Sequence, residues 1–155
     1  MNSPNLAMSE AERAAIIAAC TELMLRYAWT IDHRDFDGYC ALFCEEMSLK
    51  MPGQPATTSR AALRKGLEFR PKDLTSRHVI TNPLVEVIDD KTARGACYLS
   101  LYRLNGAPDA NGLLPLKQPA AIGEYHDTYA KTAEGWRFKT RELRMIFRAE
   151  TNQSA

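Results

Sequence analysis

The histidine at position 78 is the side chain in this sequence best suited to acid–base chemistry. It lies near the start of an apolar, β-rich run, residues 76–87, and no neighbour in the sequence obviously neutralises it. Because imidazole titrates close to neutral pH, one nearby carboxylate can prepare it to take or give a proton. A strand cap or a hydrogen-bonded core histidine is the alternative interpretation. The case for catalysis therefore depends on partners from elsewhere in the chain.

Asp32 is a candidate partner because it falls where a long helix is expected to end. Ser9 and Glu12 have the spacing of a capping box, which predicts the start of that helix. Apolar residues then recur at spacings of three and four, at Ile16, Cys20, Leu23, Tyr27 and Ile31. A carboxylate at a helix end is also commonly a solvated or capping group, so both readings of Asp32 stay open.

The rest of the chain predicts two short helices followed by long strands. The helices are expected around residues 39–43 and over 60–67, and the strands around 47–51 and over 77–88, 92–104, 121–131 and 135–148. Helices first and hairpin-connected strands afterwards predict a single α+β domain, residues 1–155 with a core of about 9–148. Its helices would pack on one face of a curved sheet and enclose a pocket.

Two features of the strand region leave alternatives open. In strand 92–104, Ala96, Tyr98, Ser100 and Tyr102 share one face, which is either solvated or lines a polar cavity. Residues 105–119 form a long loop with three prolines and two glycines. Such a loop fits either a pocket rim or an exposed insertion.

Composition excludes several functional classes. Twenty Lys and Arg nearly balance nineteen Asp and Glu, which argues against a nucleic-acid partner. The four cysteines do not have the spacing of a zinc site, and no metal is expected. We expect a cytoplasmic protein with reduced thiols, without a membrane span or export signal. Residues 1–8 should form a loose leader, and the polar tail from Glu150 should be frayed.

Four sequence signs, in this order, resemble the SnoaL-like group of the NTF2-like superfamily, whose members fold as α+β cones. They are Tyr27-x4-Asp32, DFDGYCALF (35–43), RHVITN (77–82), and GEYHDTY with GWRFKTR (123–141). Within that group the chain resembles the branch of scytalone dehydratase and bile acid 7α-dehydratase. These enzymes remove water from polycyclic or aromatic substrates without a metal or organic cofactor, so no cofactor is implied here.

The resemblance implies catalytic roles for Tyr27, Asp32 and His78, which match the tyrosine, aspartate and histidine of that branch. It also implies an arginine on the last strand, for which Arg141 matches better than Arg144, since one β-bulge would exchange their faces. A salt bridge from Arg141 to Asp127 or Glu124 is the structural alternative.

The match to the bile acid enzyme is incomplete. That enzyme carries a second acidic residue on the strand after the histidine, where this chain has Tyr98, Ser100 and Tyr102 and no carboxylate. We expect Tyr98 and Asn82 to bind substrate. The alternative for Asn82, which precedes Pro83, is a bulge or kink in the strand.

These residues predict a cofactor-independent lyase (dehydratase) or isomerase acting on a hydrophobic, cyclic hydroxy-carbonyl compound. Asp32 would orient His78, and Tyr27 would hydrogen-bond a developing enolate oxygen. The alternative is a non-catalytic module that binds a small molecule or supports assembly, such as a small-subunit-like protein of a ring-hydroxylating dioxygenase. The resemblance also implies a homodimer paired through the outer sheet face, for which Phe138, Met145 and Phe147 are candidates.

Overall fold

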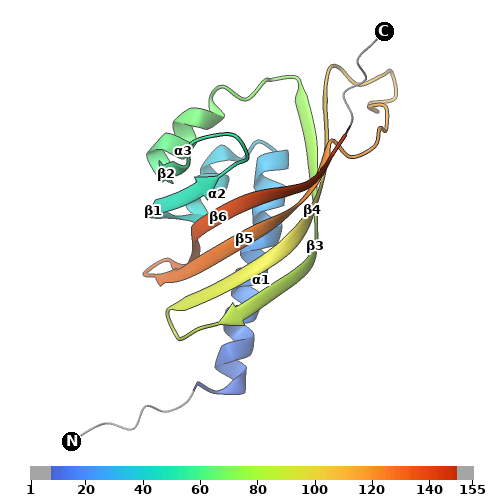
Figure 1. Cartoon of the computed structure of the whole chain (residues 1–155). Coiled ribbons are helices and arrows are strands. Elements are labelled where there is room, and N and C mark those ends of the chain that lie inside the picture. Colours follow the sequence, from blue (N-terminus) through green and yellow to red (C-terminus); the bar gives the residue numbers. More distant parts are fainter. Residues whose placement is uncertain (1–7, 150–155) are drawn as a thin grey trace, which may run out of the picture.

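The computed structural model describes residues 8–149 of the chain. The expected frayed tail from Glu150, and all but the last residue of the expected leader, lie outside the described residues. The described part has the predicted α+β architecture of the NTF2-like fold, in which N-terminal helices pack on a six-stranded, mostly antiparallel sheet (Figure 1).

Three helices and six strands make up the fold of residues 8–149. They are α1 (Glu10–Asp32), α2 (Phe36–Ala41), β1 (Phe43–Lys50), β2 (Thr57–Ser59), α3 (Arg60–Leu67), β3 (Leu74–Val87), β4 (Thr92–Asn105), β5 (Ala121–Thr132) and β6 (Gly135–Arg148). The strand order is β2-β1-β6-β5-β4-β3, and β1 pairs parallel to β6 while the other neighbours are antiparallel. Helix α1 crosses behind the long strands, and α2 and α3 lie beside β1 and β2 (Figure 1).

Helix α1 begins and ends where its sequence signals predict. The side chain of Ser9 accepts a hydrogen bond from the backbone N–H of Glu12, and Glu12 accepts one from the backbone of Ser9, so the capping box forms as expected. The helix has the length and composition of a membrane span, but a helix in a protein core passes the same test. Its apolar stripe, including Cys20, Met24 and Tyr27, is buried against the sheet.

The alternation of strand residues gives the sheet two faces of different character. We call the face covered by α1 the inner face; it carries buried residues such as Cys97, Leu99 and Tyr125. We call the opposite side the outer face; it carries the even-numbered residues of β4 and β5, such as Tyr98 and His126.

Several element boundaries differ from the sequence prediction, and the short strand β2 was not predicted. Phe43, expected in a short helix, begins β1 instead, because its buried ring packs on Phe138 of β6. Strand β3 begins at Leu74 rather than at residue 77, since β4 continues to Asn105 and pairs with those first residues. The extension brings Ser76 onto the inner face beside His78.

Candidate functional site

Asp32 and His78 form a hydrogen-bonded pair between the end of α1 and the inner face of β3. The Nδ1 atom of His78 lies 2.6 Å from Asp32 Oδ1, and the backbone N–H of His78 donates to Asp32 Oδ2 at 2.7 Å. Their side chains are only 11% and 5% exposed. An ionised Asp32 accepts the Nδ1–H, so the lone pair of the imidazole lies on Nε2. No side chain among residues 8–149 hydrogen-bonds to that Nε2 atom.

Two further side chains hold Asp32 in place. The hydroxyl of Ser76 donates to Asp32 Oδ1 at 2.7 Å, and Nη2 of Arg70 donates to the Ser76 oxygen at 2.6 Å. Burial on its own would raise the pKa of Asp32, but the hydrogen bonds from His78 and Ser76 outweigh it and leave the pKa below its ordinary value. Asp32 is therefore an ionised acceptor at neutral pH, fixed by three donors.

Tyr27 joins the pair from the helix side. Its ring is perpendicular to that of His78 with centroids 6.3 Å apart, and it contacts Tyr39 at 4.8 Å and Tyr125 at 5.3 Å. Burial raises the pKa of both Tyr39 and Tyr125 well above the ordinary value, so these are neutral phenols. The surroundings of His78 are thus aromatic and largely dry.

Arg141 lies behind Tyr27 in a fully buried ion pair. Its Nε and Nη2 donate to the two oxygens of Asp127 at 3.0 and 3.2 Å, and the hydroxyl of Tyr129 donates to the same carboxylate at 2.9 Å. The guanidinium carbon lies 4.0 Å from the ring centroid of Tyr27 and 3.9 Å from that of Tyr125.

The structural alternative for Arg141, a salt bridge to Asp127, is therefore correct. The carboxylate raises the pKa of Arg141 despite burial, so the guanidinium stays charged. Its position supports the ring of Tyr27, and its charge is already paired. Arg144 does not take its place, because it lies on the outer face and pairs with Glu142 at 3.2 Å.

The structure does not bring Asn82 and Tyr98 to this site, contrary to expectation. Asn82 has a positive φ of 53° and lies at an irregularity in the pairing of β3 between Thr81 and Leu84, so its bulge interpretation is correct. Tyr98 is 52% exposed on the outer face, on the opposite side of the sheet from His78. The strand period of two decides this placement.

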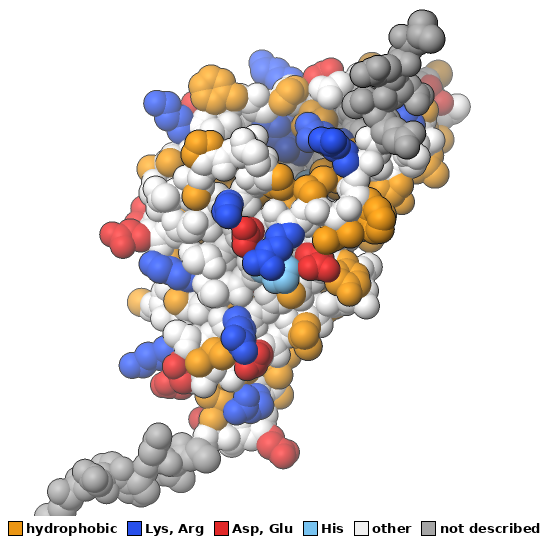
Figure 2. All heavy atoms as spheres, viewed as in Figure 1, with side chains coloured by type: hydrophobic (Ala, Val, Ile, Leu, Met, Phe, Trp, Pro, Cys, Tyr) orange, Lys and Arg blue, Asp and Glu red, His pale blue; other side chains and the backbone are white. Residues whose placement is uncertain are grey.

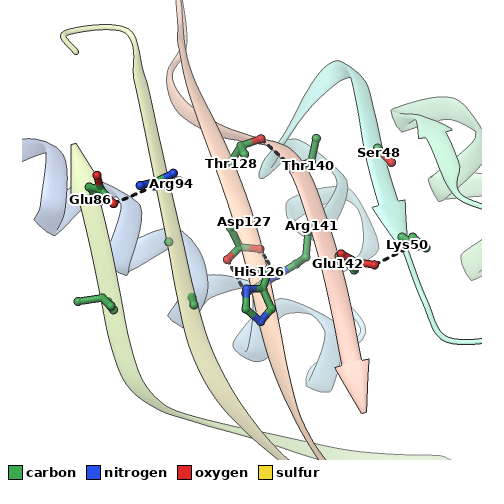
Figure 3. A pocket seen from close by; sticks show the side chains of 13 residues that line it. Ser48, Lys50, Glu86, Arg94, His126, Asp127, Thr128, Thr140, Arg141 and Glu142 are labelled. Carbon is green, nitrogen blue, oxygen red and sulfur yellow. Dashed lines mark hydrogen bonds and ion pairs between the residues drawn. The ribbon is translucent and has the colours of Figure 1, made fainter. Parts of the chain in front are cut away.

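The outer face carries a separate hollow of about 490 Å³ (Figure 3). Paired charges surround it, with Arg94 to Glu86 at 2.8 Å and Lys50 to Glu142 at 2.9 Å. His126 also lines this hollow, on the opposite side of the sheet from His78. The sheet separates the hollow from the Asp32–His78 pair.

The cysteines and the other titratable groups offer no second chemistry in the described residues. All four thiols are free and buried, and burial raises the pKa of Cys20 to about 12 and that of Cys97 to about 11. No group of three or more His, Cys, Asp or Glu side chains within residues 8–149 could hold a metal ion.

The family comparison agrees with this architecture. A SnoaL-like domain matches residues 12–142. The chain belongs to the SnoaL-like domain family. A search of curated proteins gave no significant match.

Solved structures share the fold at low sequence identity. One is titled "Putative Scytalone Dehydratase" from Novosphingobium aromaticivorans, with 21% identity, 95% of each chain covered and a TM-score of 0.76. LinA has 15% identity, a TM-score of 0.77 and coverage of 95% of this chain and 97% of its own. A Mycobacterium tuberculosis protein of unknown function has 29% identity and a TM-score of 0.69, covering 90% of this chain and 78% of its own.

Sequence reasoning brought Tyr27, Asp32 and His78 into one hypothesis, and the structure places all three together. It did not assign a role to Ser76 or Arg70. Ser76 could have been found, because a residue two positions before His78 shares its face of the strand. Arg70 lies in the connection between α3 and β3, where no periodicity indicates direction.

Proposed function

We propose that this protein is a cofactor-independent lyase (dehydratase) or isomerase that acts by His78–Asp32 acid–base catalysis on a hydrophobic, cyclic hydroxy-carbonyl compound. The observation that carries the proposal is the 2.6 Å contact between His78 Nδ1 and Asp32 Oδ1, which leaves Nε2 of His78 without a hydrogen-bond partner among residues 8–149. A base in this arrangement is oriented and directed away from its carboxylate. One of the similar structures bears the name "Putative Scytalone Dehydratase", which supports the same reaction class.

The dehydration of a cyclic β-hydroxy ketone illustrates the proposed mechanism. Nε2 of His78 takes a proton from the carbon between the carbonyl and the hydroxyl-bearing carbon, and the C–H electron pair forms the enolate. Tyr27 donates a hydrogen bond to the enolate oxygen, a contribution on the order of 3 kcal/mol in a dry site. The enolate then expels the hydroxyl, which leaves as water with the proton returned by His78. An isomerase would return the proton to a different carbon instead.

The ionised Asp32 serves this cycle in both directions. It fixes the imidazole tautomer when His78 acts as base, and it stabilises the imidazolium that forms after proton transfer. Ser76 and the backbone N–H of His78 donate to two further lone pairs of the carboxylate, so Asp32 itself stays in place.

The test measures dehydration of 3-hydroxy-1-tetralone to 1-naphthol by the fluorescence of the product. We expect His78→Gln to lower the rate by about 100-fold or more, because it removes the base and retains a polar side chain of similar size. His126→Gln, which changes the histidine of the outer face, should match the wild type.

Equal rates for wild type and His78→Gln, or no turnover above buffer across a panel of cyclic hydroxy ketones, would contradict the proposal. A binding or assembly module of the same fold would then be the better account. A circular dichroism melt of each variant shows that a lost rate is not lost folding.

We also propose a homodimer formed through the outer face. Register places Val79, Ile122 and Phe147 in one row across β3, β5 and β6, and all three are exposed. Hydrophobic side chains gather along one side of this face (Figure 2). Phe138, expected to contribute, is instead fully buried in the core.

Light scattering after size exclusion should give twice the chain mass of 17.4 kDa. A monomeric mass at micromolar concentration would contradict the dimer.

A further inference from the structure

Three arginines from different elements gather next to the Asp32–His78 pair. Arg70 follows α3, Arg34 follows α1, and Arg103 lies near the end of β4. Strand register makes Arg103 the direct partner of Ser76, and the alternation of β4 sets Arg103 on the same face as Leu99 and Leu101. The group therefore lies at the rim of the inner face. The Ser76–Arg103 pair is two residues along β3 and β4 from the His78–Leu101 pair.

Among the described residues, Arg70 has no carboxylate in contact with its positive charge. Its Nη2 donates to the neutral hydroxyl of Ser76 at 2.6 Å, and its Nε is buried and has no hydrogen-bond partner in the part of the chain that the structure describes. Within residues 8–149, no Asp or Glu forms an ion pair with Arg34, Arg70 or Arg103. Asp32 lies near Arg70, but its carboxylate already accepts hydrogen bonds from the ring and the backbone of His78.

Charge repulsion adds to this imbalance. Burial lowers the pKa of Arg70, the nearby charges of Arg34 and Arg103 lower it further, and Asp32 acts in the opposite direction. Arg34 is held in place by donating to the backbone carbonyls of Pro71 at 3.0 Å and Arg70 at 3.3 Å. Arg34 thus fixes the segment that carries Arg70, while Arg70 and Arg103 keep N–H groups for a ligand.

We propose that Arg70 and Arg103 bind a carboxylate of the molecule that occupies the site, so that the ligand is an anionic cyclic compound. A carboxylate would satisfy the unpartnered Nε of Arg70 and offset the mutual repulsion of the guanidinium groups. The planar fork of arginine suits a carboxylate, and partial burial strengthens the contact. The inference rests on the proposed function only in treating this ligand as the substrate.

Arg141, the arginine that the resemblance implied for the site, does not bind this carboxylate. Arg141 already has Asp127 as its counter-ion, whereas Arg70 has none in contact within residues 8–149. The reactive end of the substrate would face Nε2 of His78, and its carboxylate would point toward the rim. The ring between them would contact Leu101, the strand partner of His78.

The test compares two ring compounds that differ in charge, 2-naphthoate and 2-naphthamide, by isothermal titration calorimetry. We expect the wild type to bind 2-naphthoate at least about tenfold more tightly, as for a hydrogen bond to a charged group. Arg103→Gln and Arg70→Gln should each reduce this preference to about threefold or less. Arg94→Gln, on the same strand as Arg103 but on the outer face, should retain it.

Several outcomes would overturn the proposal. One is equal affinity of the wild type for the two compounds, and another is an unchanged preference in Arg103→Gln. If Arg70→Gln fails to fold, Arg103→Gln decides the matter, because its side chain is exposed and makes no hydrogen bond in the described residues.

The binding test is independent of turnover. His78→Gln should keep the preference for 2-naphthoate, because the carboxylate binds at the rim. If His78→Gln keeps both the preference for 2-naphthoate and the turnover rate of the wild type, the anion site is supported and the catalytic proposal is rejected. If His78→Gln loses turnover and the wild type shows no preference for 2-naphthoate, the catalytic proposal is supported and the anion site is rejected.

Discussion

The two faces of the sheet each carry a histidine paired with a carboxylate, and the two pairs differ in environment. His78 and Asp32 are 2.6 Å apart with side chains 11% and 5% exposed. His126 and Glu124 are 3.0 Å apart with side chains 35% and 34% exposed. The inner pair joins residues 46 positions apart, whereas the outer pair joins residues two apart on β5.

The difference shows that residue type and distance alone do not make an acid–base pair. Asp32 receives donors from Ser76 and from both the backbone and the ring of His78, and it lies away from bulk water. Glu124 has no comparable set of donors, and solvent screens its attraction for His126. An electrostatic contact contributes more where water is excluded and both partners are held in one geometry.

The largest expected effect is a difference in the free energy of unfolding when one ion pair is broken on each face of the sheet. Arg141→Met leaves Asp127 buried and unpaired, so the free energy of unfolding should fall by roughly 3–5 kcal/mol. Arg94→Met breaks the exposed pair with Glu86, which solvent screens, and should cause no measurable change. Urea denaturation of the two variants measures both values.

A second substitution shows whether the loss comes from the uncompensated charge. Adding Asp127→Leu to Arg141→Met should recover much of the stability, because the unpaired carboxylate is removed. A fall of less than 1 kcal/mol in the single variant would mean that water or a rearranged side chain reaches Asp127, and the two faces would not differ as described.

The next effect concerns acid stability. The pKa of Asp32 is lower in the folded chain than its ordinary value of 3.8, so the unfolded chain binds the proton more tightly. The stabilisation from Asp32 is therefore complete above that value and is lost as the pH falls through the folded pKa. Wild type should lose stability more steeply below about pH 4 than Asp32→Asn does.

Urea melts at several pH values between neutral and acid give these curves. Glu124→Gln provides the outer-face control. Its free energy of unfolding should fall as steeply below about pH 4 as that of the wild type, because Asp32 is intact in it. Superimposable curves for wild type and Asp32→Asn would show that the contacts around Asp32 do not favour its ionised form.

The smallest expected effect concerns the hydroxyl that links Asp32 to Arg70. Ser76→Ala removes one hydrogen bond to the carboxylate, and the free energy of unfolding should fall by about 1 kcal/mol. Ser100→Ala, on the outer face of β4, should change it less. The ¹⁵N spectrum of the His78 ring should still show the Nδ1–H tautomer in Ser76→Ala; its loss would mean that Ser76, rather than Asp32, sets the orientation of the imidazole.

Local signals in the sequence were sufficient for most of the fold. The Ser9–Glu12 capping box, the spacing of apolar residues in α1 and the bounds of α3 all agree with the structure, because each depends on residues a few positions apart. The face assignments of β4 also followed from its alternation. The start of β1 at Phe43 and its parallel pairing with β6 did not, since they depend on contacts between distant segments.

The candidate site divides in the same way. Resemblance and element order indicated Tyr27, Asp32 and His78, and the structure places them together. The roles of Arg141 and Tyr98 could not be read from their neighbours, because the fold alone sets the ion partner of the first and the exposure of the second.

The sequence by itself determined most of the helices and strands and the side chains able to move a proton, since these depend on local propensity, periodicity and residue chemistry. The tertiary structure alone decided which side chains share a face and exclude water. It thereby made Asp32 the partner of His78, paired Arg141 with Asp127, and left Arg70 with no counter-ion in contact among the described residues. Charge, hydrogen bonding and burial act between groups that are close in space, and 46 residues separate Asp32 from His78 along the chain.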